Sequence, residues 1–123
     1  MGSGIRLSGW RILVVEDEYV IAVDLAASLE DLGVAVVGPV RSVAEALALI
    51  EREATLDAAV LDVNLGAEKV FPVARSLQAR GVPFVFATGY DHWIIPSAFE
   101  KVPRFEKPVD TAELVRALAP QGA

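Results

Sequence analysis

The stretch Ala58-Ala59-Val60-Leu61-Asp62 places an acidic residue directly after four apolar ones. The run is short and does not alternate between apolar and polar residues, which is typical of a strand that is covered on both faces. Three further runs of this kind occupy residues 12–15, 34–37 and 84–87, and a weaker fifth strand is expected around residues 104–106. These runs predict a sheet whose strands are largely buried.

Helical patterns separate the runs. The first helix is indicated by apolar residues at helical spacing that end before Gly33, a natural stop. Its apolar positions are Ile21, Leu25, Leu29 and Leu32. Three further helices are predicted from their first residues. Two begin with a capping-box pair, Ser42 with Glu45 and Asp110 with Glu113. The third begins near Pro72, because proline fits a helix only in its first turn. This alternation predicts an α/β fold with a parallel sheet, and Pro96 leaves room only for a short or irregular fourth helix.

Length and composition narrow the class of protein. The 123 residues suit one domain, and we expect a flexible segment at residues 1–9 followed by a domain over residues 10–120. A net charge of -6 without any Lys/Arg run argues against direct binding to nucleic acid, where neutralisation of phosphates dominates affinity. No apolar run approaches the ~18 residues of a membrane span, and the absence of cysteine fits a reducing cytoplasm.

Polar side chains follow four of the five predicted strands. Glu16 and Asp17 come after the first strand, Asp62 after the third, Thr88 after the fourth and Lys107 after the fifth. Ligands of an open parallel sheet bind beyond the carboxyl ends of its strands. We therefore expect these five side chains to meet at one edge of the sheet.

Three carboxylates at one edge would repel one another, and each would resist ionisation. A hard divalent cation removes that conflict, and Mg²⁺ prefers oxygen ligands. An aspartate in that setting can act as a nucleophile and form an acyl phosphate. Thr88 would then supply a hydroxyl donor, and Lys107 a cation, to the phosphoryl oxygens. Each residue alone has an ordinary explanation, such as a helix N-terminus for Glu16 and Asp17 or a turn for Asp62; the combination favours a site.

The residues resemble the receiver domains of response regulators in bacterial two-component signalling, from about residue 11 to residue 118. The matching pieces, in chain order, are Val-Glu-Asp-Glu at 15–18, Leu-Asp at 61–62, Ala-Thr-Gly at 87–89 and Lys-Pro at 107–108. The resemblance implies a flavodoxin-like, doubly wound sheet of five parallel strands in the order 2-1-3-4-5. It also implies a cis bond between Lys107 and Pro108.

The resemblance implies a role for each site residue. Asp62 would accept a phosphoryl group from a phosphohistidine donor, Thr88 would swing toward that group, and Lys107 would pair with it. Magnesium would be the cofactor. Its implied ligands are Glu16, Asp17, Asp62 and the backbone carbonyl of Asn64.

The implied function is signalling rather than enzymatic turnover. A sensor histidine kinase or histidine phosphotransfer protein would phosphorylate the domain, which would act in the cytoplasm on a downstream protein target, without direct contact to nucleic acid or membrane. Many receivers pair through their last helices, so the resemblance leaves room for a homodimer. Whether the chain acts alone or belongs to a larger regulator stays open.

A narrower resemblance is carried by Phe86-Ala87-Thr88-Gly89-Tyr90, together with Leu65-Gly66 and residues 105–108. It is similar to a subgroup of single-domain receivers found in alphaproteobacterial general stress signalling. The chain also departs from the usual receiver pattern at three positions. Gly66 replaces a proline, which predicts a flexible loop, Val70 replaces a glycine, and Arg104 replaces an aromatic residue. We therefore expect the switch to work by ordering residues 90–99, where Trp93, Ile94 and Ile95 are candidates for a partner surface.

Two other functions compete with the phosphorylated receiver. The first is a pseudo-receiver, an interaction module whose state is not set by phosphate; the complete set of site residues argues against it. The second is an enzyme or cofactor-binding protein on the same fold. Flavin binding would need a phosphate-binding loop after the first strand, but Glu16-Asp17-Glu18 at that place would repel a phosphate. An aspartate-nucleophile phosphatase would usually carry its nucleophile on the first strand and a second acid two residues later, and residues 16–19 do not fit that pattern.

Overall fold

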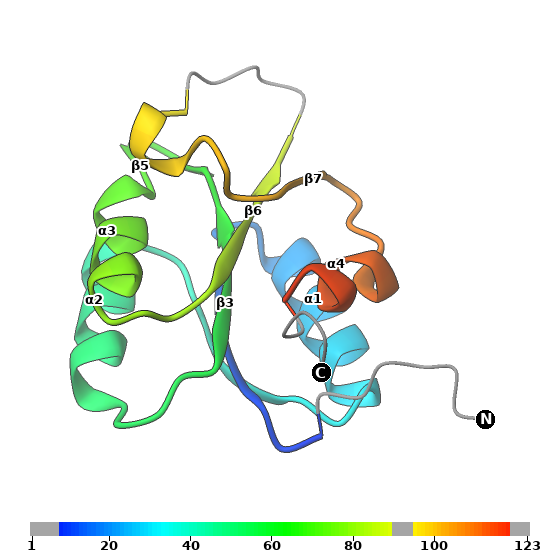
Figure 1. Cartoon of the computed structure of the whole chain (residues 1–123). Helices are drawn as coiled ribbons and strands as arrows, with labels where there is room; N and C mark the ends of the chain where they lie inside the picture. The colour runs from blue at the N-terminus through cyan, green and yellow to red at the C-terminus, as the bar shows by residue number, and fades with distance from the viewer. Residues whose placement is uncertain (1–7, 90–94, 119–123) are drawn as a thin grey trace.

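Five parallel strands form a single sheet in the order β2-β1-β3-β6-β7 (Figure 1). The structure is a computed structural model that describes residues 8–89 and 95–118. Because β4 and β5 form a separate small sheet, β6 and β7 are the fourth and fifth strands of the main sheet, and the order is the predicted 2-1-3-4-5. The strands are β1 (Arg11–Val15), β2 (Ala35–Val40), β3 (Ala58–Asp62), β6 (Phe84–Thr88) and β7 (Arg104–Glu106).

Helices cover both faces of the sheet (Figure 1). On one face lie α1 (Tyr19–Asp31) and α4 (Thr111–Leu118), and on the other lie α2 (Val43–Arg52) and α3 (Phe71–Ala79). The predicted helix starts are confirmed. Ser42 Oγ accepts a hydrogen bond from the N–H of Glu45 at 3.1 Å, Asp110 Oδ1 accepts from the N–H of Ala112 at 3.0 Å, and Pro72 lies in the first turn of α3. The sequence therefore predicted where these helices begin.

The core consists of two apolar layers, one on each side of the sheet. Successive residues of a strand point to opposite faces, so Leu13 and Val15 pack in the layer under α2 and α3, whereas Ile12 and Val14 pack in the layer under α1 and α4. All five residues of β3 are buried, as its unbroken apolar run predicted. The same expectation was too strong for β2, because this strand lies at the edge of the sheet and leaves Ala35 exposed.

Two connections near the carboxyl ends of the strands have structure of their own. The connection after β3 forms an antiparallel hairpin of β4 (Asn64–Leu65) and β5 (Glu68–Lys69), where the sequence analysis expected a flexible loop. Gly66 makes the turn with φ +69°, a conformation that glycine adopts without steric cost. In the connection after β6, the 3-10 helix η1 (Ser97–Phe99) is the predicted short fourth helix. Trp93 and Ile94, predicted as partner contacts, lie outside the described residues.

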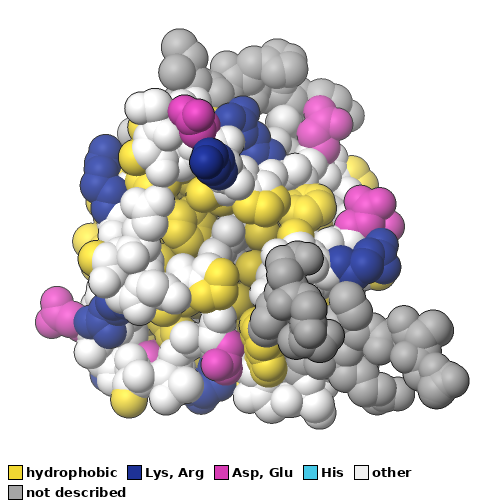
Figure 2. Space-filling view, in the orientation of Figure 1, with side chains coloured by type: hydrophobic (Ala, Val, Ile, Leu, Met, Phe, Trp, Pro, Cys, Tyr) yellow, Lys and Arg dark blue, Asp and Glu magenta, His cyan; other side chains and the backbone are white. Residues whose placement is uncertain are grey.

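The face of the molecule in Figure 2 is hollowed, and hydrophobic side chains gather in the hollow. It is lined by the end of α3, the residues before β6 and β7, η1 and the end of α4. The residues before β6 and β7 lie at the amino ends of these strands, so the hollow lies away from the carboxyl ends. Within residues 8–89 and 95–118, no helix has the length and apolar character needed to cross a membrane.

Candidate functional site

Strand pairing sets the positions of the predicted site residues. Val15 at the end of β1 pairs with Leu61, and Asp62 at the end of β3 pairs with Ala87. The residue after β1 therefore emerges beside Asp62, and Thr88 ends β6 one position further on. The connection after β7 is tied to the same place, because the N–H of Lys107 donates to the carbonyl of Thr88 at 2.9 Å.

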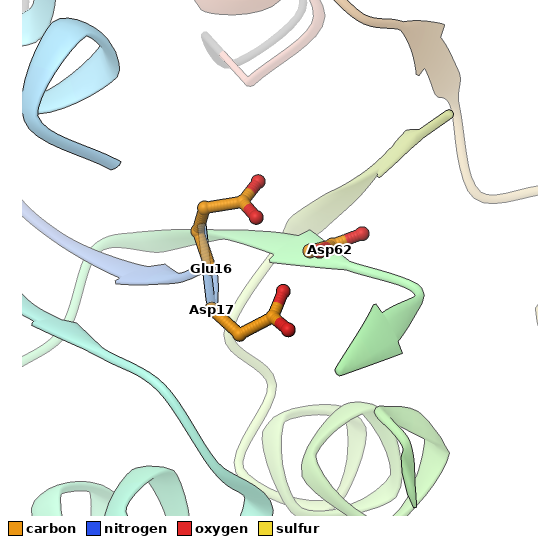
Figure 3. A group of neighbouring side chains, drawn as sticks. All are labelled: Glu16, Asp17 and Asp62. Carbon is orange, nitrogen blue, oxygen red and sulfur yellow. The ribbon is translucent and has the colours of Figure 1, made fainter. Parts of the chain in front are cut away.

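Three carboxyl groups meet at the ends of β1 and β3 (Figure 3). Glu16, Asp17 and Asp62 each place a carboxylate oxygen within 4.8 Å of the others. Glu16 and Asp62 are almost completely buried, with 2% and 4% of their surface exposed. Backbone groups help to hold them: Glu16 Oε2 accepts from the N–H of Glu18 at 3.1 Å, and Asp62 Oδ1 accepts from the N–H of Asn64 at 3.3 Å. The predicted acidic residues are thus brought together by the fold.

Lys107 supplies the positive charge in this cluster. Its Nζ lies 2.7 Å from Glu16 Oε1 and 3.2 Å from Asp62 Oδ2, so one ammonium group contacts both buried carboxylates. Burial favours the neutral amine and lowers the pKa of Lys107, but its hydrogen bonds and charge interactions with Glu16 and Asp62 outweigh this and raise the pKa overall. The lysine is therefore positively charged at neutral pH.

The balance of charge is different at Asp62. Burial, reinforced by the hydrogen bond and repulsion from Glu16, raises the pKa of Asp62 to about 7, against the opposing effect of Lys107. One lysine thus does not compensate three neighbouring acids. Clustered carboxylate oxygens with uncompensated negative charge are the donor set that suits a hard divalent cation. The residues present therefore fit the Mg²⁺ that the sequence pattern implied.

A small hollow of about 100 Å³ adjoins the carboxylate of Asp62. Asn64, Thr88 and Lys107 line it as well, so side chains from the ends of three strands of the main sheet and from the hairpin share one space. The volume accommodates roughly three water-sized groups, since a water molecule occupies ~30 Å³ in the liquid. The hollow therefore has room for a small group between Asp62 and the residues Asn64, Thr88 and Lys107.

Lys69 also contacts a residue of the site, although no sequence motif pointed to it. Its Nζ donates to Asn64 Oδ1 at 3.1 Å across the β4–β5 hairpin, where the two residues are paired. One sequence signal for this hairpin was present: Gly66-Ala67 is a two-residue connection with glycine first, which is typical of a type II′ turn. Recognising that turn would have paired residue 64 with residue 69.

Solved structures of similar fold and sequence are described as response regulator receivers. A response regulator receiver protein from Sinorhizobium medicae WSM419 is 27% identical with a TM-score of 0.75, and the match covers 91% of this chain and 93% of that one. SdrG from Sphingomonas melonis Fr1, in a solution structure, is 46% identical with a TM-score of 0.79, over 89% of this chain and 96% of SdrG. This chain belongs to the response regulator receiver domains.

Part of a longer regulator also matches this receiver domain. The phyllosphere-induced regulator PhyR of Methylorubrum extorquens is 35% identical over 82 residues, which make up 65% of this chain and 31% of PhyR. The receiver thus spans about a third of the curated relative that it matches. No protein-family model matches the chain. The Lys107–Pro108 bond is cis, as the resemblance to receivers implied.

Proposed function

We propose that the protein is a phosphorylation-switched receiver and that Asp62 is its phosphoacceptor. The observation that carries the proposal is the position of Asp62: it ends the central buried strand, beside Glu16 and Asp17, with Lys107 Nζ at 3.2 Å. A carboxylate with an ammonium group beside it and an adjoining hollow has both a nucleophilic oxygen and a place for an incoming phosphoryl group.

In the proposed reaction, a carboxylate oxygen of Asp62 attacks the phosphorus of a phosphohistidine. The nitrogen–phosphorus bond breaks, and its electron pair returns to the imidazole of the donor protein. Lys107 can then pair with a phosphoryl oxygen, and the hydroxyl of Thr88 can donate to another. Only the ionised carboxylate is a nucleophile, so a pKa of about 7 makes neighbouring positive charge decisive for reactivity at Asp62.

Magnesium is the proposed cofactor. It would be held by the carboxylates of Glu16, Asp17 and Asp62 and by the backbone carbonyl of Asn64. When bound, Mg²⁺ supplies charge neutralisation for the phosphoryl group during transfer. The same charge would favour the ionised form of Asp62, because an opposite charge nearby lowers the pKa of a carboxyl group.

The proposed partners follow from this chemistry. The donor is a sensor histidine kinase or a histidine phosphotransfer protein, the output is a changed contact with a downstream protein, and a homodimer is a further option. We place the protein in the cytoplasm and assign the receiver domain to residues 10–120. We also assign the chain to the Phe-Ala-Thr-Gly-Tyr subgroup of receivers, on the motif at residues 86–90.

We further propose that the segment after Thr88 transmits the change. Arg104, at the position where receivers usually carry an aromatic residue, is exposed on β7, and Phe105 packs in the layer under α1 and α4. The aromatic residue that connects this segment to β6 is instead Phe99 of η1, whose ring centroid lies 6.0 Å from that of Phe86. Amide exchange in residues 95–103 should change on phosphorylation; identical exchange in both forms would remove this part of the proposal.

The proposal is tested by intact mass after incubation with Mg²⁺ and acetyl phosphate or phosphoramidate. The expected result is a labile gain of one phosphoryl group that is absent in Asp62→Asn and absent with a chelator. A gain that persists in Asp62→Asn would show a different acceptor. Absence of any gain, together with no Mg²⁺ binding by titration calorimetry, would favour the pseudo-receiver.

A further inference from the structure

A chain of two hydrogen bonds leads from Lys69 to the carboxylate of Asp62. Lys69 Nζ donates to Asn64 Oδ1 at 3.1 Å, and the backbone N–H of Asn64 donates to Asp62 Oδ1 at 3.3 Å. Asn64 also lines the hollow beside Asp62. Lys69 therefore fixes the side chain of a residue that borders the space where a phosphoryl group or an attacking water would lie.

The hairpin that carries Lys69 is itself anchored. Asn64 and Lys69 are paired across β4 and β5, and Gly66 closes the turn close to the acidic cluster: a Cβ at Gly66 would lie 3.8 Å from Asp17 Oδ2. On the other side of the turn, the carboxylate of Glu68 accepts a hydrogen bond from the N–H of Val43 at the start of α2 at 3.2 Å. Lys69 thus reaches Asn64 from a fixed backbone position.

We propose that Lys69 is a positioning residue that slows hydrolysis of the phosphorylated protein by occupying the amide oxygen of Asn64. The inference rests on the proposed phosphorylation of Asp62. In hydrolysis, water oxygen attacks phosphorus, the bond between phosphorus and the Asp62 oxygen breaks, and its electron pair returns to the carboxylate. One water proton passes to a phosphoryl oxygen, so the products are the aspartate and inorganic phosphate.

The role of the amide follows from its donor and acceptor groups. An asparagine side chain offers one oxygen, which accepts hydrogen bonds, and one NH₂ group, which donates them. A free amide oxygen in the hollow can accept a hydrogen bond from water and hold that water near the phosphorus. With Lys69 on Oδ1, the amide presents its NH₂ group to other partners, and this group can donate to a phosphoryl oxygen but cannot accept from water. Lys69 thereby favours contact with the phosphoryl group over activation of water.

The test measures the lifetime of the phosphorylated protein. Wild type, Lys69→Ala, Lys69→Arg and Arg75→Ala are phosphorylated with Mg²⁺ and phosphoramidate, the donor is removed, and loss of the phosphoryl mass is followed. Lys69→Ala should hydrolyse about 3- to 10-fold faster, the range that corresponds to the net contribution of one hydrogen bond. Lys69→Arg retains a donor and should restore most of the lifetime, whereas Arg75→Ala removes an exposed cation from α3 and should match wild type.

A double-mutant cycle with Asn64→Ala separates positioning from a general structural effect. If Lys69 acts through the amide, Lys69→Ala will not accelerate hydrolysis further when residue 64 is alanine. Equal acceleration in both backgrounds, or an unchanged or longer lifetime in Lys69→Ala, would overturn the inference. Failure of wild type to take up a phosphoryl group would instead overturn the proposed function, so the two results are distinguishable.

Discussion

The connection after β3 and the connection after β6 border the same site, and both place apolar residues in the core, but their other side-chain contacts differ. In the first, residues 63–70, two side chains make polar contacts near the site: Lys69 Nζ donates to Asn64 Oδ1, and the carboxylate of Glu68 accepts from the N–H at the start of α2. In the second, the described residues 95–103 pack around an aromatic ring, and one hydrogen bond from Gln78 reaches the carbonyl of Ala98. Phe99 is completely buried there, and its ring is stacked on that of Phe71 with a centroid distance of 5.9 Å.

These two kinds of contact are expected to affect different properties of the protein. A hydrogen bond in a partly exposed hairpin contributes little to the free energy of unfolding, but it can fix a polar group beside a reacting atom. A buried phenylalanine contributes several kcal/mol and transmits strain, because a close-packed core does not deform gradually. We therefore expect substitution of Lys69 or Glu68 to change rates at Asp62, and substitution of Phe99 to change stability and the response to phosphorylation.

The largest effect is expected for Phe99→Ala. Removing this ring leaves a cavity among Phe71, Phe84 and Phe86, and it should lower the free energy of unfolding by about 3–5 kcal/mol. Urea denaturation followed by circular dichroism measures the loss. Phe99→Leu fills most of the cavity and serves as the matched control. A loss below about 1 kcal/mol in Phe99→Ala would mean that the second connection is not anchored by this packing.

The next effect concerns the charge of Asp62 in the absence of metal. Its pKa is about 7 in the folded protein, against 3.8 for an ordinary aspartate, so the folded state keeps its proton over a range of pH where the unfolded state has lost it. Stability should therefore fall as the pH rises from about 4 to about 7. Asp62→Asn removes this loss and should stabilise the protein above pH 7, because the amide carries no charge that must be buried beside Glu16.

Thermal unfolding of both proteins in chelator, at pH 5 and pH 8, checks the sign of this effect. The advantage of Asp62→Asn should be larger at pH 8 than at pH 5. An equal advantage at both values would show that the buried carboxyl group does not titrate in this range. A stability advantage of Asp62→Asn that is larger at pH 5 than at pH 8 would mean that the pKa of Asp62 is lowered in the folded protein, not raised.

A smaller effect is expected from added Mg²⁺. Binding to the folded state alone stabilises a protein by about 1.4 kcal/mol at ten times the Kd. Wild type should show a Tm that rises with Mg²⁺ concentration, whereas Glu16→Gln and Asp62→Asn should show a much smaller rise. Asp24→Asn, on the exposed surface of α1, removes a carboxylate outside the cluster and should respond as wild type does. Equal responses in all four proteins would place the ion elsewhere.

The smallest effect is expected for Glu68→Gln in the first connection. The contact with Val43 N is exposed, so its loss should cost less than about 1 kcal/mol in urea denaturation. The phosphoryl lifetime is the more informative readout, because a looser hairpin holds Lys69 less firmly against Asn64. If Glu68→Gln destabilised the protein as much as Phe99→Ala does, the polar contact of Glu68 would contribute to stability as strongly as the buried ring, and the two connections would not differ in this way.

The sequence predicted most of the fold because its strongest signals are local. An unbroken apolar run such as residues 58–61 identifies a strand covered on both faces, and Ser42 and Asp110 mark helix starts through hydrogen bonds within three residues. The candidate site followed from one topological rule, that residues after parallel strands meet at the carboxyl edge. Strand pairing then brought Glu16, Asp17 and Asp62 together.

The remaining features depend on contacts that no single segment specifies. Lys107 Nζ lies closer to Glu16 than to Asp62. This difference depends on how the residues after β7 pack against the residues after β1, which neither sequence motif specifies. The contact between Lys69 and Asn64 requires the register of a hairpin with only two residues in each strand. The exposure of Ala35 reflects the edge position of β2, which its apolar sequence alone does not distinguish from a central position.

The central claim is that Asp62 carries the phosphoryl group. It is tested most directly by phosphorylating wild type with Mg²⁺ and acetyl phosphate, reducing the acyl phosphate with borohydride and mapping the product by tandem mass spectrometry. Reduction of an aspartyl phosphate leaves homoserine at the labelled position. The account predicts homoserine at position 62 alone, and none after treatment with chelator. Homoserine at position 17, or at any other aspartate, would contradict it.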